Sequence, residues 1–549
     1  MNRNVNDTFA KTPTPHFPRS RFDMGIKKRL QTQGHGRLYP FFARAVFPGD
    51  TWQMDLTTFV RMDTSVRVPL DDIYLDTYWF FVPYRIIDKD FPKILGEGEP
   101  SDYDDVDYGF PSFEVETSDS GTLGIDCLLS YLGYNQSDIY YSEAADKPYS
   151  YIHDDDICPY PLMAYYKIFN DWFRDENVDA SIPYGDLKGN SLFSIDIIFD
   201  DLNALKVNRY HDYFSSAVIS PQKGPAVTIP LGTSAPVGVI PSASGTNSNG
   251  LNMTIGTGTF TEGKFFDTTR VAGNTTGLTG NPIIADLSQA AGTINELRLA
   301  FAIQSLYERR GRFGTRYIET IRGQWGIEVP DSFLERPEYL GGSRVTLNNV
   351  PVLSTENSSQ LGQMAGNSAT LSNGGSWSKT FVEYGIIIGL SCTRVKHSYT
   401  QGKRNELFGL KSQLDLYNPV FANIGMQGIK LSSIYNDAGS DDKVFAYQEA
   451  WAELRSDFDT FAGLFGMISN NSDLKNYWHY GDYYSSEPQF SADWLKEPVS
   501  NVSRTLTGQL INGANSESGH QFMFGYYYHP VVTRILPAHS IPVELIGRL

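Results

Sequence analysis

The chain has 549 residues, a formal net charge of −18, 41% hydrophobic and 20% charged residues, and three cysteines. These totals are typical of a globular protein with a large core, and the length alone suggests two to four domains. Three cysteines without a CxxC pair exclude a disulfide framework and indicate a reducing compartment. No apolar run reaches about 18 residues and no apolar signal core opens the chain, so we expect neither a membrane span nor secretion.

The N-terminal 37 residues are basic although the whole chain is acidic. They hold eight Lys or Arg residues against two acids, which leaves about −24 for the remainder. This asymmetry is typical of a tail that contacts an anionic partner. A disordered tail that only aids solubility fits the charge equally well, so both interpretations stay open at this point.

Three segments indicate β-strands. Residues 60–71 have apolar residues or Thr at every even position, which predicts a strand with one buried face. Residues 78–82 read Tyr-Trp-Phe-Phe-Val without alternation. We therefore expect a strand covered on both faces, by an opposing sheet and by a helical connection. Residues 382–393 alternate again on an apolar face that ends at Cys392, and we interpret this cysteine as a core residue rather than a nucleophile.

Three other segments have the three-four spacing of an apolar helix stripe. Residues 162–173 follow Pro161, which suits a first helical turn. Residues 294–310 begin with a Thr293–Glu296 capping box, and Gly311 suits the C-terminal stop. In residues 444–465 we predict helix for at least the first half.

One region departs sharply in composition. Residues 223–292 hold 12 Gly, 12 Thr and only six charged residues. Such a segment builds little core of its own and lies between strongly patterned regions, so it is predicted to be one large surface insertion. Elsewhere, many short alternating runs with isolated helices favour a mainly β sandwich or barrel with helices in its connections.

No segment carries a complete catalytic or metal-binding motif. The nearest phosphate-loop match, residues 258–265, has Phe265 where a hydroxyl is required. The acidic stretches 101–107 and 153–156 are interpreted as solvated turns rather than cation sites. We expect no catalytic residue, no metal and no cofactor.

Two segments leave alternatives open. Residues 476–494 mix aromatic and acidic side chains, as a sugar-binding or sugar-cleaving β-sandwich protein does, although a Tyr-rich packing segment explains them equally simply. Residues 307–317 collect arginines at a helix C-terminus, where cations complement the helix dipole. The functional interpretation of these arginines is contact with phosphates or with the acids of a neighbouring subunit.

Five phrases, in this order, carry a family resemblance: FPGDT (47–51), NDWFRDEN (170–177), RGRFGTRYIE (310–319), RPEYLGG (336–342) and YQEAWAELR (447–455). The chain resembles the major capsid protein of microviruses, the small tailless single-stranded DNA bacteriophages, and of their gokushovirus branch in particular. The resemblance implies a mainly β fold, an eight-stranded antiparallel jelly roll with helical and long-loop insertions. Many copies would close into a T=1 icosahedral shell.

The resemblance also implies a division of the chain. Residues 1–40 would form a basic N-terminal arm, and residues 41–222 the first part of the jelly roll. Residues 223–292 would form a variable protrusion at three-fold axes, and residues 293–549 the second part with an interlocking C-terminal tail. The protrusion would meet a host receptor, with these candidate residues: Ser244, Thr246, Asn247, Asn249, Asn252 and Thr254.

Physical roles follow for both ends of the chain. The arm would neutralise packaged single-stranded DNA through Arg19, Arg21, Lys27, Lys28 and Arg29, although Arg19 and Arg21 could instead pair with acids of a neighbouring subunit. The Pro-punctuated C-terminus would run along a neighbour through Ile541, Pro542, Leu545 and Ile546.

We therefore expect a structural protein and no enzyme, located in the virion and assembled in the bacterial host cytoplasm. Its expected partners are further copies of itself, single-stranded DNA, other phage structural or DNA-binding proteins, and a host receptor. The alternative is the carbohydrate-binding or glycoside-cleaving β-sandwich protein.

Overall fold

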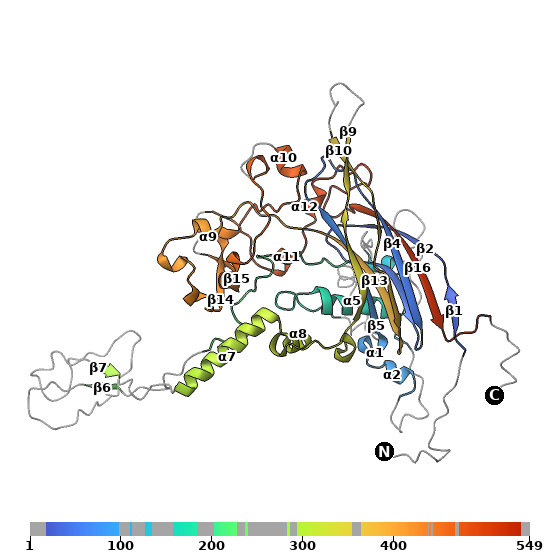
Figure 1. Ribbon diagram of the computed structural model, residues 1–549, viewed down its shortest axis with the longest axis horizontal. Helices are drawn as coiled ribbons and strands as arrows, with labels where there is room; N and C mark the ends of the chain where they lie inside the picture. Colours follow the sequence, from blue (N-terminus) through green and yellow to red (C-terminus); the bar gives the residue numbers. More distant parts are fainter. Residues whose placement is uncertain are drawn as a thin grey trace, which may run out of the picture. The chain divides into compact units, whose positions relative to one another are not determined.

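The computed structural model describes residues 18–97, 110–111, 127–133, 158–183, 203–227, 237–239, 283–285, 294–353, 364–437, 439–440, 443–466 and 472–539 (Figure 1). The chain divides into two compact units, one of Met1–Pro221 with Gly311–Leu549 and one of Gln222–Arg310, and each is described by itself. The described part is mainly β, with antiparallel sheets and few helices.

The larger sheet has six strands built around a long central pair, β16 (Phe522–Arg534) and β4 (Thr51–Met62). On the free side of β16 lie β1 (Ser20–Asp23) and β2 (Lys27–Gln33), and on the free side of β4 lie β11 (Thr370–Asn373) and β12 (Trp377–Thr380). All pairings are antiparallel. Strand β4 alternates strictly between buried and more exposed residues, so one face of this sheet points into a core.

The second sheet has four antiparallel strands in the order β3 (Tyr39–Val46), β13 (Gly385–Val395), β5 (Ile73–Pro83) and β8 (Glu338–Leu347). Along the chain, β2, β3, β4 and β5 alternate between the two sheets. Strand β8 stays beside β5, and β11 with β12, β13 and β16 alternate again.

Strand β5 confirms the prediction for residues 78–82, because both of its faces are covered. Trp79 and Phe81 pack between the two sheets, where Trp79 meets Phe41 edge-on at 5.1 Å between ring centroids. Phe80 and Val82 point the other way, into a second core formed with helices. Figure 1 shows α1 (Tyr84–Ile87), α2 (Phe91–Ile94) and α5 (Tyr160–Ile168) near β5 and β13. Helix α3 (Leu128–Leu132) belongs to the same core.

Other predicted elements also hold. Strand β13 places Ile386, Ile388, Leu390 and Cys392 in the core with the helices, and Cys392 is fully buried. Helix α5 starts with a proline in its first turn and continues as a π-helical turn, Phe169–Phe173, which together match the predicted helix over 162–173.

The remaining strands form two-stranded sheets, and the remaining helices lie in the connections. Two-stranded sheets pair β6 (Val237–Val239) with β7 (Ile283–Ala285), β9 (Asn349–Leu353) with β10 (Met364–Ser368), and β14 (Met426–Lys430) with β15 (Val444–Glu449). The other helices are α7 (Ile294–Phe313), α8 (Tyr317–Thr320), α9 (Asn405–Phe408), α10 (Ser472–Tyr477), α11 (Ala492–Leu495) and α12 (Ser500–Ser503).

Two strand predictions extend too far. Strand β4 ends at Met62, because the buried Asp63 accepts backbone N–H groups of Leu510 and Ile511 at 2.7 and 2.9 Å and turns the chain out of the sheet. Leu70, predicted on the buried face, is 72% exposed. Likewise Val382 precedes β13 and is 84% exposed.

Two helix predictions also need correction. Residues 444–449 form strand β15, since β14 offers them a ladder partner, and Trp451 follows in a left-handed conformation with φ of 62°. Tertiary pairing here overrides a spacing that resembled a helix. Helix α7 exists as predicted but runs through Gly311 to Phe313, and Gly314, with φ of 87°, ends it. Thr293 lies outside the described residues.

Candidate functional site

The outer face of the six-stranded sheet carries two of the five basic residues that the sequence singled out, Arg21 and Lys28. Its rows follow from the strand register: Leu30 lies opposite Gly525, Gly525 opposite Phe59, and Phe59 opposite Leu371. Leu30 and Leu371 are 66% and 68% exposed. This outer row, named here the apolar row, therefore crosses the whole sheet on its solvent side.

Cations lie on both sides of the apolar row. On one side of the apolar row, Lys28 lies two residues from Leu30 along β2 and opposite Tyr527. On the other side, Arg61 lies two residues from Phe59 along β4 and opposite Met523. Alternation along β2 and β4 places Lys28 and Arg61 on the same face as Phe59. An aromatic and apolar strip between two cations is the composition of surfaces that hold single-stranded nucleic acid, where bases stack and phosphates meet Lys or Arg.

The five predicted DNA-contact residues do not lie together. Arg19, Arg21, Lys27 and Lys28 are exposed along β1, β2 and the residue before β1. Arg29 differs, because its guanidinium donates to the carbonyl of Ser130 at 3.4 Å and also to that of Tyr131, at the end of α3. Burial lowers the pKa of Arg29.

The face is mixed in charge rather than uniformly basic. Asp23 accepts a hydrogen bond from His529 at 2.7 Å, which lowers the pKa of the carboxyl group together with the backbone N–H of Gly25. Asp55 lies opposite His529 on the neighbouring strand. Asp23 and Asp55 both lie beyond Lys28 on the side away from Arg61, so neither acid lies between the two cations.

Phe59, Arg61 and Tyr527 also belong to this face, although the sequence-based prediction did not include them. The alternation of β4 already places Phe59 and Arg61 on the side opposite the buried residues, and that signal was available. Tyr527 belongs to a strand more than 450 residues away along the chain, and only the register brings it beside Lys28.

Three of the family-like phrases converge on one structural clamp at the end of the π-helical turn. Arg316 donates to the carbonyl groups of Asn170 and Arg174 at 2.7 and 2.9 Å. The Arg336 guanidinium stacks 3.8 Å from the Trp172 ring, whose Nε1 donates to the carbonyl of Pro337 at 3.0 Å. These contacts satisfy carbonyl groups that a helix C-terminus leaves open. Within this clamp, Arg316 and Arg336 act in fixing the fold.

A fourth phrase, on β15, holds two residues of the body that flank residues 222–310 in the sequence. Val218 exchanges two backbone hydrogen bonds of 2.8 Å with Tyr447 on β15. Two residues further along β15, Glu449 forms ion pairs with Arg312 and with Arg455. The departing and the returning chain are thus held on one strand.

Residues of the phrase FPGDT contact Arg534, the last residue of β16. Asp50 is fully buried and accepts two hydrogen bonds from Arg534, at 2.9 and 2.6 Å. Arg534 also lies 4.8 Å above the Phe47 ring. The phrases that carry the family resemblance therefore hold the sandwich together rather than forming a reactive centre.

A buried polar network crosses the body beneath the second sheet. His397 donates through Nδ1 to Asp482 and through Nε2 to Glu497, both at 3.1 Å, and Glu497 also lies 3.0 Å from the Nε2 of His35. Arg209 pairs with Asp482 on the other side. Despite burial, the two carboxylates raise the pKa of His397 to about 9, and the neighbouring cations hold the carboxyl pKa values below their usual range.

This network bears on the carbohydrate alternative. Asp482 lies within the aromatic segment 476–494, and its carboxylate is held by Arg209, His397 and Asn501. A second acid of the segment, Glu487, pairs with Lys443. Both of these carboxylates are thus engaged in ion pairs within the chain.

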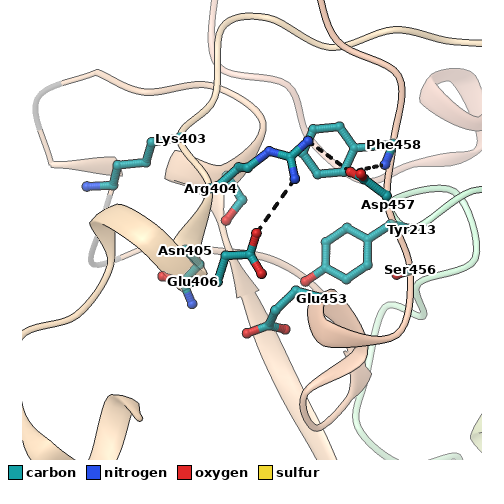
Figure 2. A pocket seen from close by; sticks show the side chains of 10 residues that line it. Tyr213, Lys403, Arg404, Asn405, Glu406, Glu453, Ser456, Asp457 and Phe458 are labelled. Carbon is teal, nitrogen blue, oxygen red and sulfur yellow. Dashed lines mark hydrogen bonds and ion pairs between the residues drawn. The ribbon is translucent and has the colours of Figure 1, made fainter. Parts of the chain in front are cut away.

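A small hollow on the same unit is too small for an organic ligand (Figure 2). Arg404 crosses it to pair with Asp457 at 2.9 Å and with Glu406 at 3.6 Å, and Tyr213 and Glu453 line the opposite side. The hollow is partly open to solvent, and its volume of about 20 Å³ holds about one water molecule.

Several predicted sites fall outside the described residues. The protrusion residues between 244 and 254, the tail residues between 541 and 546, and the segments 101–107, 153–156 and 258–265 all lie there. Within the described ranges, no cluster of His, Cys, Asp or Glu is arranged to hold a metal ion. Over the same ranges, no helix combines the length and the hydropathy that a bilayer crossing requires.

Similarity to known proteins shows which class of protein this chain belongs to. A family model described as "Capsid protein (F protein)" matches residues 10–543. The capsid protein VP1 of Spiroplasma virus 4 is 33% identical over 99% of this chain and 98% of its own length. VP1 of Bdellovibrio phage phiMH2K is 31% identical and VP1 of Chlamydia phage 1 is 28% identical, each over 98% of both chains.

The chain therefore belongs to the capsid protein (F protein) family, and the resemblance to the microvirus capsid proteins is confirmed. It is a structural protein of the virion, from a family of shell-forming proteins rather than enzymes.

Proposed function

We propose that this protein is the jelly-roll subunit of a closed icosahedral shell that encloses a single-stranded DNA genome. The strand order supports the jelly roll: β2-β16-β4 with β11 and β12 faces β3-β13-β5-β8, and the chain alternates between the layers. This is the pattern of two Greek keys wound into a double sheet, an architecture common in viral capsids. Negative-stain imaging of the purified chain tests the shell, and uniform spherical particles are the expected result.

The outer face of the six-stranded sheet is our candidate for DNA contact. Arg21 and Lys28 supply cations on this face, and the apolar row with Phe59 supplies stacking surface. Binding of this kind is independent of sequence and weakens with salt, because each neutralised phosphate releases counterions. The observation that carries this proposal is the flanking of the apolar row by Lys28 and Arg61.

The DNA proposal is tested by salt titration of oligonucleotide binding to the unassembled subunit. The double variant Arg21→Gln/Lys28→Gln should lower the slope of log affinity against log salt by about 1.4, roughly 0.7 for each lost phosphate contact. The control, Lys89→Gln/Lys93→Gln, removes the same charge from the α2 region. If both double variants have the same slope as the unaltered chain, this face is not the DNA surface.

Two finer roles rest on the family resemblance alone. Segment 223–292, with its candidate residues between Ser244 and Thr254, is proposed to meet a host receptor, and the C-terminal residues Ile541 to Ile546 are proposed to run along a neighbouring subunit. Deleting 541–549 should block shell formation. Replacing 223–292 by a short Gly/Ser linker should spare shell formation but abolish adsorption to host cells.

Other phage structural or DNA-binding proteins are proposed as further partners, with assembly in the host cytoplasm. Co-purification with particles from infected cells tests this proposal, and particles that contain this chain alone would reject it.

A further inference from the structure

The chain contains three Asn-Gly pairs, of which two lie in the described residues and the third, at 249–250, lies outside them. Asn373 precedes Gly374 at the end of β11, and Asn512 precedes Gly513 in the loop between α12 and β16. Glycine has no Cβ, so its backbone nitrogen can approach the side chain of the preceding Asn closely. Both described pairs are therefore suited to the same reaction, and the fold decides which of them is free to react.

The backbone nitrogen of Gly374 is engaged in the six-stranded sheet. It donates to the carbonyl of Leu56 on β4 at 3.1 Å. Asn373 itself lies opposite Thr57 in the ladder of β11 and β4. Attack by this nitrogen on the Asn side chain requires that the ladder opens locally first, which costs free energy. In the folded chain we therefore expect Asn373 to be protected.

The Asn512–Gly513 pair is not held in this way. Asn512 is exposed, and Gly513 lies in a turn with φ of 80°. Among the residues that the structure describes, the backbone N–H of Gly513 has no hydrogen-bond acceptor. The side chain of Asn512 is free to rotate toward this nitrogen, which is only a few bonds away, so the two reacting groups are kept close together.

The reaction that this pair can undergo uses only water. The nitrogen of Gly513 attacks Cγ of Asn512, a bond forms between these two atoms, and the bond from Cγ to the side-chain nitrogen breaks. The side-chain nitrogen leaves as ammonia and takes up the proton that Gly513 gives up. Water then opens the resulting succinimide ring at one of its two carbonyl carbons. Opening at the main-chain carbonyl carbon leaves an isoaspartyl residue, and opening at Cγ leaves an aspartyl residue.

The isoaspartyl product would disturb the loop, because residues on both sides of the pair are held in the core. On one side, the buried Asp63 accepts a hydrogen bond from the N–H of Ile511 at 2.9 Å. On the other side, Ala514 is fully buried between the two sheets. An isoaspartyl residue routes the main chain through Cβ and so adds one carbon to the link between these two anchors. A packed core accommodates added atoms poorly, so we expect one of the anchors to loosen.

We propose that Asn512 is a self-modification site of the folded chain, and that its isoaspartyl product loosens residues 508–514 from the core. Conversion at this pair lowers the stability of the subunit as the protein ages. The inference is independent of shell formation and of DNA contact, because the reaction needs only the folded chain and water.

Peptide mapping of the full chain by mass spectrometry tests the site. After prolonged incubation in mildly alkaline buffer, the peptide with Asn512 should exchange its amide for a carboxyl group roughly ten-fold faster than the peptide with Asn373, because only the latter must open a ladder first. The control is the chain unfolded in urea, where the two rates should be similar. Conversion of Asn512 no faster than that of Asn373 in the folded chain would overturn the proposal, and so would the same ratio of rates in folded and unfolded chains.

A competition on the aged chain tests the loosening. Protease is added at increasing urea concentration, and the chains that stay intact are mapped. Chains with an isoaspartyl residue at 512 should be cleaved at lower urea than unmodified chains, so the isoaspartyl peptide should be depleted from the intact fraction. An equal share of this peptide before and after the protease treatment would overturn the loosening.

The variant Asn512→Asp is the matched control for charge. It carries the negative charge of the product without the additional carbon, and at an exposed position it should leave the free energy of unfolding in urea nearly unchanged. If Asn512→Asp loses as much stability as the isoaspartyl chains, the lengthened link is not the cause and the loosening is rejected.

Discussion

Exchanging His397 for Gln should weaken the folded subunit in a way that depends on pH. In the native chain, the protonated imidazole lies between Asp482 and Glu497, and its side chain is fully buried. The Gln side chain keeps a hydrogen-bonding group at this place but removes the positive charge. Two carboxylates then share the single charge of Arg209.

The magnitude follows from the pKa of His397, which rises from 6.5 to about 9 on folding. A raised pKa stabilises the folded state fully below the unfolded value, and that contribution is lost as the pH rises through the folded value. The shift corresponds to about 3 kcal/mol. Breaking a buried ion pair costs a similar amount, about 3–5 kcal/mol.

Urea unfolding of the unassembled subunit between pH 6 and pH 9.5 measures this effect. The free-energy difference between the native chain and His397→Gln should be largest at pH 6 and should shrink toward pH 9.5. His529→Gln is the matched control, because His529 pairs with Asp23 on the surface and should change stability by less than about 1 kcal/mol. A constant difference across this range, or none, would refute a charged His397.

Three further outcomes are expected from the same subunit. Trp79→Ala should lower the free energy of unfolding by about 3–5 kcal/mol, since it empties the space between the sheets, whereas the exposed Leu371→Ala should change it by less than about 0.5 kcal/mol in the same urea titration. Arg316→Gln should lower the free energy of unfolding by about 2–3 kcal/mol, because it leaves carbonyl groups of the clamp unpaired. Arg322→Gln, at an exposed ion pair, should lower it by less than about 1 kcal/mol. Equal effects of the two substitutions would contradict the clamp. A thiol reagent should modify Cys158 alone in the folded chain, as peptide mass spectrometry would show, because the two other cysteines are buried; labelling of either of those before unfolding would count against the described core.

The parts of the fold that followed from the sequence were those fixed by local composition. An uninterrupted run such as Tyr78 to Val82 has no polar side for water, so a strand covered on both faces was the simplest solution, and β5 has that form. The prediction of a helix over residues 444–449 was wrong. Their apolar spacing suits a helix, but β14, a separate segment, pairs with them as a strand. Pairing of this kind is decided by tertiary structure, which no single window of sequence contains.

The candidate site was predictable only in part. The charge of the N-terminal residues was evident, but the separation of Arg29 from its neighbours depends on α3, roughly a hundred residues away. The row from Leu30 through Phe59 to Leu371 depends on the register among four strands, β2, β16, β4 and β11. Alternation indicates which side chains share a face, and only the assembled sheet shows which of them become neighbours.

The anchoring of Val218 and Arg312 on β15 has a consequence for engineering. Val218 and Arg312 are both held at one short strand of the body, and this strand fixes the spacing between them. The entropic cost of closing a loop rises only slowly with its length. Exchanging the stretch between Val218 and Arg312 for linkers of different length is therefore expected to change the free energy of unfolding of the body only slightly.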